Sequence, residues 1–334
     1  MGLYIEVATQ LTRVFFLTLQ MMTPEFHSTN SVTRSGEARM ISDVNNTVSE
    51  PYKAIVYLYI DGGIDSFNLL APHTCPDTDL YNEYRTVRGL SGESQGIGME
   101  LNNLYSVPAN NVTYQPCTHF GIHEDMSLLK QLYDVEDLLF VSNAGLLARP
   151  VDIDNYKGET PVQLFSHNGM RDETKRVDVF DMFVGTGVGG RIATVLKRKG
   201  IPTNVFSIFG SQAFLTGIAP DGPSPYILST QGLSSFNVDP TLSNMNDIIK
   251  DLNNASTIDS GWFGETWSAK LSEIIVNQDT LQTLVENVTV NSPFKSEDEI
   301  NEIADQLELV TRLMQTANER GVGRDIFYVE VRLS

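Results

Sequence analysis

One apolar segment and the residues that follow it constrain the fold of this 334-residue chain more than any other feature. Residues 54–60, AIVYLYI, form a continuous apolar run, which is typical of a strand buried on both faces of a parallel sheet. The run stops at Asp61-Gly62-Gly63-Ile64-Asp65, so this strand would deliver two acids to the edge of its sheet. In open α/β sheets, ligands bind at the carboxyl ends of the strands. The sequence therefore predicts an α/β fold with a site at this edge.

Later segments alternate between helix and strand patterns. Apolar positions at helical spacing in residues 126–133 predict a helix, and residues 138–143 follow as a short buried strand. Residues 191–199 predict another helix, and residues 204–209 another strand. This order is typical of βαβ units, so we expect a mostly parallel sheet flanked by helices.

Two long stretches lack a sustained period. Residues 73–120 and 217–260 are rich in Pro, Asn, Gly and Ser, so we expect long irregular loops there. Long helices are expected within residues 262–287 and 296–319, followed by a strand at 325–334. A central parallel strand normally continues into a loop and a crossover helix. We therefore expect a fragment whose sheet is incomplete at the C-terminus, the alternative being a natural final edge strand.

The charge of the chain bears on its partners. Asp and Glu number 42 against 23 Lys and Arg, which gives a formal net charge of -19. Such a surface repels polyanions, so nucleic acid is excluded as an expected partner. A small anionic substrate would need a local cation, either a metal or an arginine, to offset this field.

The first 50 residues are expected to contribute little to the fold. Ser, Thr, Asn and Glu predominate there, so residues 1–50 are interpreted as a leader or disordered arm, and residues 51–334 as the folded part. The apolar patch at residues 14–22 is too short to span a bilayer and makes a poor signal peptide. No other segment is apolar enough, so no transmembrane segment is expected.

Cysteines and glycosylation acceptors bear on location. Cys75 and Cys117 are the two cysteines, and both lie in loop-like sequence. A disulfide between them is favoured, with two unpaired thiols as the alternative. Four Asn-x-Ser/Thr patterns for N-glycosylation begin at Asn45, Asn111, Asn254 and Asn287. A chain this rich in Asn, Ser and Thr could contain that number by chance. These features permit a location in the secretory pathway or outside the cell, which is the location that we expect.

A glycine cluster at residues 185–190, GTGVGG, formally fits the G-x-G-x-x-G pattern of dinucleotide-binding proteins and precedes a predicted helix. However, the next predicted strand ends in Gly210-Ser211-Gln212, without an acid that could hold a ribose hydroxyl. Dinucleotide binding is therefore disfavoured.

Residues 62–72, GGIDSFNLLAP, resemble the "GGxDxxNxxxP" opening of the DUF1501 proteins, a branch of the alkaline phosphatase and sulfatase superfamily. Four further blocks resemble family elements in the same order: residues 81–88, 120–123 (FGIH), 164–168 (LFSHN) and 185–193 (GTGVGGRIA). The resemblance implies an alkaline-phosphatase-like α/β fold, of which residues 51–334 would form the N-terminal part.

The same resemblance implies metal-assisted hydrolysis of a small phosphate or sulfate ester, with a divalent metal (Zn, Mg or Ca) in the full-length protein. Asp61 and Asp65 match the family's acids after the first strand and are the expected metal ligands. Ser166 is the expected nucleophile, and His167 would bind the metal or act as a base. Arg191 would face the anion. Three residues would support the substrate or the loops: Asn68, His123 and Asn168.

Each of these residues also has a structural alternative. Asp65 can close an Asx-turn, and Asp61 can cap a neighbouring turn. Ser166 can be the N-cap of a helix. His123 and His167 can bond to nearby loop backbone, while Arg191 can pack at the rim of the sheet and Asn68 can stabilise its loop.

The sequence departs from the family in three respects, one of which is that residues 167–170 (HNGM) replace the usual HNDQ. The later family motifs that would supply further Asp and His ligands are absent, and Val188 replaces the usual Trp of the glycine block. Two hypotheses follow: an ester hydrolase that is inactive as this fragment, and a non-catalytic secreted or surface binding protein that keeps the fold without the metal centre. The first predicts that Asp61 or Asp65 lies within a few ångström of Ser166 and His167.

Overall fold

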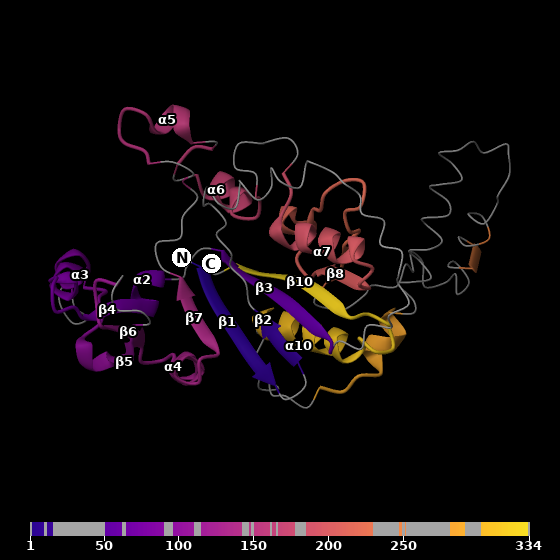
Figure 1. Ribbon diagram of the computed structural model, residues 1–334, viewed down its shortest axis with the longest axis horizontal. Helices are drawn as coiled ribbons and strands as arrows, with labels where there is room; N and C mark the ends of the chain where they lie inside the picture. Colours follow the sequence, from indigo (N-terminus) through magenta and orange to yellow (C-terminus); the bar gives the residue numbers. More distant parts are fainter. Residues whose placement is uncertain are drawn as a thin grey trace. The chain divides into compact units, whose positions relative to one another are not determined.

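The computed structural model describes most of the chain between residues 51 and 229 and the C-terminal helix and strand. The described residues are 2–9, 12–15, 51–61, 65–89, 96–109, 115–141, 147, 150–160, 162–164, 166–177, 185–229, 247–248, 251, 281–290 and 302–332. The chain forms two compact units (Figure 1). Unit 1 comprises residues 1–36, 55–174 and 332–334, and unit 2 comprises residues 37–54 and 175–331.

Unit 2 is built on parallel strands. β10 (Arg324–Arg332) pairs in parallel with β8 (Thr203–Ser207), and β8 pairs in parallel with β9 (Tyr226–Ile227). The four-stranded parallel sheet has the strand order β3-β10-β8-β9, with β3 at Lys53–Asp61. Residues 53–54 of β3 belong to unit 2, and residues 55–61 belong to unit 1. The first residue of β3, Lys53, donates its backbone N–H to the carbonyl of Gly323 at 3.2 Å.

Helices cover both faces of these strands. Figure 1 shows α7 (Val188–Arg198) and α10 (Glu302–Gln315) on opposite sides of β8 and β10. Because both faces are covered, the centres of the strands are apolar, at residues 205–206 in β8 and 326–329 in β10. Phe206 and Phe327 are fully buried and stack with ring centroids 5.2 Å apart, which joins β8 to β10 in the core.

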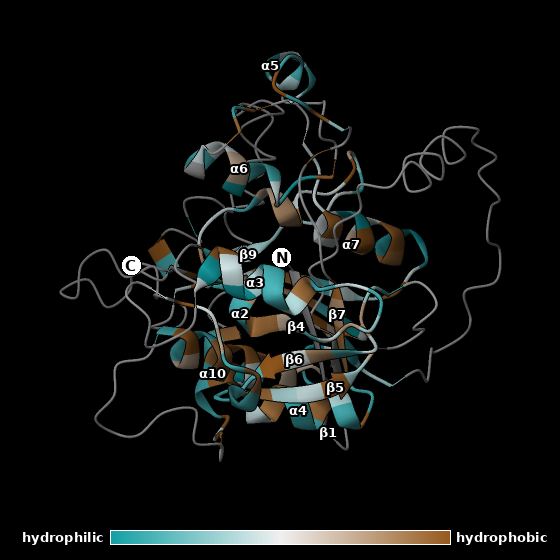
Figure 2. Ribbon diagram, turned by 90° about the vertical axis from the view of Figure 1, so that its left-hand side faces the viewer, coloured by the Kyte–Doolittle hydropathy of each residue, from teal (hydrophilic) through white to brown (hydrophobic). Residues whose placement is uncertain are grey.

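Unit 1 contains a small antiparallel sheet with the order β4-β6-β5. Its strands are β4 (Leu70–Thr74), β5 (Leu104–Pro108) and β6 (His119–His123). Figure 2 shows apolar colouring along β4 and β6, and the central Ile122 is fully buried. The associated helices are α2 (Ser66–Leu69), α3 (Leu80–Arg88), the 3-10 turn η1 (Leu101–Asn103) and α4 (Ser127–Asp134). A disulfide between Cys75 and Cys117 joins the end of β4 to the approach to β6.

Three more strands of unit 1 are antiparallel. β1 (Gly2–Thr9) pairs with β2 (Thr12–Phe15) on one side and with β7 (Leu138–Val141) on the other. β1 and β2 belong to the segment 1–50 that the sequence predicts to be a leader or disordered arm. Residues 10–11 and 16–50 of this segment lie outside the described part, so that interpretation stays a prediction. Unit 1 also contains α5 (Tyr156–Glu159) and α6 (His167–Glu173).

The α/β class and the positions of the main apolar elements are confirmed. The predicted strands at 54–60, 204–209 and 325–334 correspond to β3, β8 and β10, and the helix expected at 191–199 corresponds to α7. The disulfide is also present, rather than two free thiols. Most of the helix predicted at 262–287, and the start of the one predicted at 296–319, lie outside the described residues.

Two sequence predictions were wrong. Residues 73–120 are not one irregular loop, because they include α3, η1, β5 and the start of β6. The pattern was hard to see because β5 buries only Leu104 and Val107 of its five residues. The βαβ interpretation around α4 also fails: the strand before it, β6, and the strand after it, β7, both pair antiparallel.

Candidate functional site

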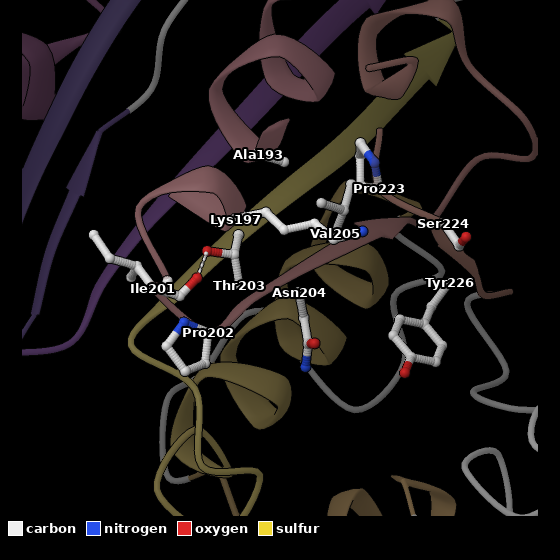
Figure 3. Close-up of a pocket in the computed structure, with 11 residues that line it drawn as sticks. Ala193, Lys197, Ile201, Pro202, Thr203, Asn204, Val205, Pro223, Ser224 and Tyr226 are labelled. Atoms are coloured by element: carbon white, nitrogen blue, oxygen red, sulfur yellow. Dashed lines mark hydrogen bonds between the residues drawn. The ribbon is translucent and has the colours of Figure 1, made fainter. Parts of the chain in front are cut away.

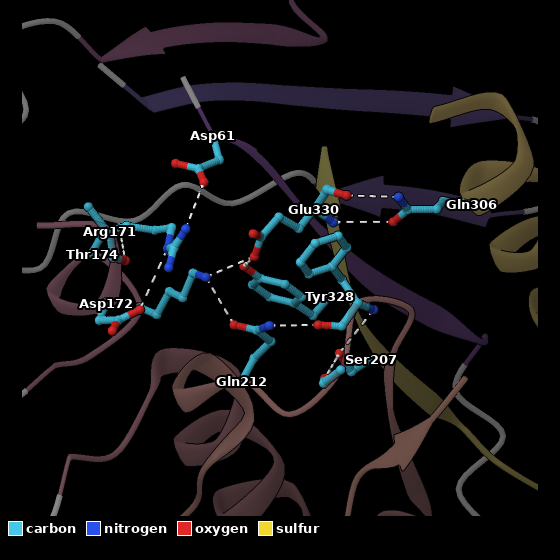
Figure 4. Close-up of polar contacts among 12 residues, drawn as sticks. Asp61, Arg171, Asp172, Thr174, Ser207, Gln212, Gln306, Tyr328 and Glu330 are labelled. Atoms are coloured by element: carbon cyan, nitrogen blue, oxygen red, sulfur yellow. Dashed lines mark hydrogen bonds and ion pairs between the residues drawn. The ribbon is translucent and has the colours of Figure 1, made fainter. Parts of the chain in front are cut away.

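The end of β3 lies against α6. Asp61, the last residue of β3, accepts a hydrogen bond on Oδ2 from Nη1 of Arg171 at 3.2 Å (Figure 4). Both side chains are 23% exposed, so the pair lies at the rim of the fold rather than in free solvent. Arg171 is also 3.7 Å from Asp172 through its Nε. The structure thus brings together the first predicted acid and the helix that Ser166 opens.

Ser166 is the N-cap of α6. Its backbone is extended, and its Oγ accepts a hydrogen bond from the backbone N–H of Gly169 at 3.3 Å. This contact satisfies one of the amide groups that lack a partner at a helix start. His167 begins α6, and its side chain lies outside the described part; Asn168 is exposed in the first turn. The hydroxyl predicted as a nucleophile therefore has a structural role at this helix start.

Asp65 caps the short helix α2. Its Oδ1 accepts from the backbone N–H of Phe67 at 3.2 Å, and its Oδ2 forms an ion pair with Arg88 of α3. The guanidinium of Arg88 also lies over the Phe67 ring, 5.5 Å from its centroid. Both carboxylate oxygens of Asp65 thus have partners that hold α2 against α3.

Asn68 connects three segments of the same region. Its Oδ1 accepts from the Tyr84 hydroxyl at 2.6 Å, and its Nδ2 donates to the carbonyl of Ile97 at 2.5 Å. The Tyr84 oxygen in turn accepts from the backbone N–H of Met99 at 2.6 Å, and burial raises the pKa of this hydroxyl. These contacts suit the predicted supporting role of Asn68, because they tie α2, α3 and residues 97–99 together.

Two other predicted residues make local contacts. His123 ends β6, and its Nδ1 accepts from the backbone N–H of Asp125 at 3.1 Å. Arg191 lies in α7 of unit 2 and donates from Nε to the Thr186 hydroxyl at 2.6 Å. The His123 contact is of the kind given as its structural alternative, a bond to nearby loop backbone, whereas the Arg191 contact tests neither of its two readings, which stay predictions.

The two acids do not fit a divalent metal as they are arranged. Each is already paired with a guanidinium, Asp61 with Arg171 and Asp65 with Arg88. A divalent cation at either carboxylate would lie beside a fixed positive charge, which opposes its binding. Within the part of the chain that the structure describes, no three or more His, Cys, Asp and Glu side chains are grouped so that they could hold a metal ion.

The glycine cluster before α7 serves close packing. A Cβ at Gly187 would overlap backbone atoms of Phe214, and a Cβ at Gly190 would overlap those of Thr216. At Gly189 it would come within 2.5 Å of the Phe214 ring. These glycines therefore let the first turn of α7 approach the 3-10 turn η3 (Ala213–Leu215), which explains the motif without a phosphate.

Sequence reasoning missed a buried charge network in unit 2. Glu330 of β10 is fully buried, and its Oε2 accepts from Nζ of Lys175 at 2.8 Å and from the Tyr328 hydroxyl at 2.5 Å (Figure 4). Lys175 also donates to Oε1 of Gln212 at 3.0 Å. Gln306 of α10 binds the backbone N–H and carbonyl of Glu330. The available signal was a glutamate within the apolar run of residues 326–331, since a buried carboxylate needs a partner.

A second buried pair lies near the start of β10. Arg320 binds both carboxylate oxygens of Asp325, and the Tyr52 hydroxyl donates to Oδ2 of Asp325 at 2.6 Å. Burial, reinforced by the negative charge of Asp325, raises the pKa of Tyr52 above its usual value. This cluster holds the segment before β3 against unit 2.

Unit 2 has a cavity of about 390 Å³ beside the start of β8 (Figure 3). Its lining comes from the end of α7, from residues 200–205 and from residues 223–226, and Lys197 is the charged residue among them. Such a volume suits a small molecule. However, the cavity lies at the amino end of β8, whereas the ligands of open α/β sheets bind at the carboxyl ends of the strands.

Among the described residues, none of the helices combines the length and the apolar character needed to cross a membrane. In comparisons with known proteins, no family model, curated protein or solved structure matches this chain.

Proposed function

We propose that this chain is a non-catalytic binding protein with an alkaline-phosphatase-like fold, in which Asp61 and Asp65 are not metal ligands. The observation that carries the proposal is the pairing of each acid with its own arginine. In each pair the guanidinium binds Oδ2 of the carboxylate and neutralises its charge, which removes the negative charge that would attract a cation. The resemblance to the DUF1501 proteins then concerns the fold and not the chemistry.

The proposed ligand is a small anionic ester at the rim that carries Arg171. The net charge of -19 opposes the approach of anions, so a fixed cation is needed wherever one binds. Arg171 is partly exposed beside Asp61, and a guanidinium can donate two parallel hydrogen bonds to a phosphate or sulfate. In this role Asp61 orients the guanidinium, and the ester shares it.

A second candidate is a metal-dependent ester hydrolase, as the family resemblance implies. One observation favours it: Asp61 contacts α6, the helix opened by the predicted nucleophile Ser166. In that case a divalent metal would supply a Lewis acid that polarises the ester. The arginine pairs argue against this role in the present chain.

Calorimetric titration of the purified chain tests these alternatives. We expect phenyl phosphate to bind, and Arg171→Ala to weaken its binding roughly 10- to 100-fold, because a charge-assisted hydrogen bond contributes about 1.5 to 3 kcal/mol. Arg198→Ala is the matched control, since Arg198 pairs with Asp221 on the surface of unit 2 at 3.0 Å. Equal effects of the two variants would refute a binding role for Arg171.

Ester hydrolysis is measured on the same protein. We expect no turnover of 4-nitrophenyl phosphate or 4-nitrophenyl sulfate with Zn²⁺, Mg²⁺ or Ca²⁺ present. Metal-dependent turnover that is lost in Asp61→Asn would overturn the proposal in favour of the hydrolase.

We also infer that the chain passes through the secretory pathway. The Cys75–Cys117 disulfide supports this location, because such bonds persist mainly in oxidising compartments. Secretion of the folded chain, made behind a host signal peptide, without the Cys75–Cys117 disulfide would contradict the inference.

A further inference from the structure

We propose that Asn287 is an N-glycosylation site. Asn287-Val288-Thr289 has the acceptor pattern Asn-x-Thr, and Val288 satisfies the requirement that the middle residue is not proline. The structure adds what the pattern alone lacks, namely the exposure and the hydrogen bonding of the acceptor. The proposal rests on the secretory location inferred above.

The acceptor lies on the solvent side of a packed helical segment in unit 2. Residues 281–286 are helical, and Leu281 and Val285 are buried, with exposures of 5% and 7%. Asn287 is the turn residue that follows the helical segment, and both it and the preceding Glu286 are exposed. Asn287 and Thr289 are both exposed, so the two residues that the transferase recognises face solvent.

One N–H of the Asn287 side-chain amide makes a hydrogen bond that holds the side chain in place. Its Nδ2 donates to the carbonyl of Thr283 at 2.9 Å, one helical turn earlier. An asparagine amide has two N–H donors, and glycosylation replaces one of them. The bond to Thr283 can therefore persist, which leaves the other amide hydrogen as the position where the sugar is added.

The chemical step is a glycosyl transfer from a lipid-linked oligosaccharide diphosphate. Nδ2 of Asn287 forms a bond to C1 of the first sugar, and the bond from C1 to the diphosphate oxygen breaks. The amide loses one proton to the transferase base, and the lipid diphosphate leaves. No oxidation or reduction occurs. The remaining three acceptors, Asn45, Asn111 and Asn254, lie outside the described residues.

The experiment expresses the full chain behind a host signal peptide in a eukaryotic secretory host. Protein from the medium and from the endoplasmic reticulum is digested in ¹⁸O-water with peptide-N-glycosidase, which converts a glycosylated Asn into a labelled Asp. The variants Asn287→Gln and Thr289→Ala remove the acceptor, whereas Thr289→Ser keeps it and is the matched control. Cys75–Cys117 pairing is mapped in the same samples as a measure of folding.

We expect the labelled Asp at position 287 in the chain without substitutions and in Thr289→Ser. We expect no labelled Asp there in Thr289→Ala. The Asn287→Gln variant should migrate faster by one glycan. An unlabelled Asn287 in protein whose Cys75–Cys117 disulfide has formed would overturn the proposal. Failure of the inferred location is a separate result, because it is read from the disulfide and not from the label at position 287.

Discussion

Replacement of Lys175 by Met should lower the free energy of unfolding by about 3 to 5 kcal/mol, because it removes a cation that lies against the buried carboxylate of Glu330. The side chains of Lys175 and Glu330 are 5% and 0% exposed, and their charged atoms are 2.8 Å apart. Met keeps most of the volume of the lysine stem, so loss of packing contributes little. The expected change corresponds to a roughly hundred- to several-thousand-fold shift in the unfolding equilibrium.

A double-mutant cycle separates this effect from general damage. Lys175→Met combined with Glu330→Met removes both charges, and such replacement of a buried ion pair by apolar groups is often nearly neutral. Tyr328 and Gln212 lose a partner in the double variant, so we expect it to cost about 1 to 3 kcal/mol. The double variant should therefore be more stable than Lys175→Met alone.

Urea unfolding followed by far-ultraviolet circular dichroism at pH 7 measures these differences. Lys130→Met is the matched control, because Lys130 pairs with Asp134 one helical turn away on the surface of α4, where such a pair contributes about 0.3 to 0.5 kcal/mol. If Lys175→Met costs no more than Lys130→Met, the reasoning about a desolvated carboxylate at Glu330 is refuted.

Three further predictions concern packing, cross-linking and ionisation. Gly190→Ala should destabilise the fold by roughly 1 to 3 kcal/mol because its Cβ would overlap backbone, whereas Gly158→Ala, with open space around it, should not; equal melting temperatures would contradict this. Replacing Cys75 and Cys117 by Ser should cost about 4 kcal/mol in urea unfolding, the loop-entropy value for a separation of 42 residues. Burial raises the pKa of Tyr52, so above pH ~10 the unfolded chain loses this proton while the folded chain keeps it. Stability should therefore fall with rising pH by up to about 1.4 kcal/mol per unit, and Tyr52→Phe should show a shallower slope over the same range.

The elements that the sequence predicted correctly are those with a continuous apolar run or a clear helical period. β3, β8, β10 and α7 belong to this group: apolar runs mark the strands, at residues 54–60, 205–206 and 326–329, and apolar positions at helical spacing mark α7. β4, β5 and β6 do not, since they are short and partly exposed. Their pairing depends on contacts between distant segments, which local periodicity does not record.

The candidate site shows the same division. The position of Asp61 at the end of a strand was predictable, because the apolar run stops there. Its partner was not, since Arg171 lies 110 residues further along the chain. Lys175 and Glu330, separated by 155 residues, were missed for the same reason. A sequence pattern shows that a carboxylate exists, whereas the fold decides which cation neutralises it.

The backbone of this chain accounts for several residues of its motifs. Gly187 and Gly190 are required because backbone atoms of a neighbouring segment occupy the space of a Cβ, and Asp65 is required because α2 needs a cap. Any protein with this backbone would favour these residues, whether or not it binds a metal. The motifs are therefore explained by the backbone that they build, and they do not by themselves argue for a metal site. In the function that we propose, Arg171 and Arg88 are the residues that keep Asp61 and Asp65 from binding a metal, and the motifs of the chain predict neither arginine.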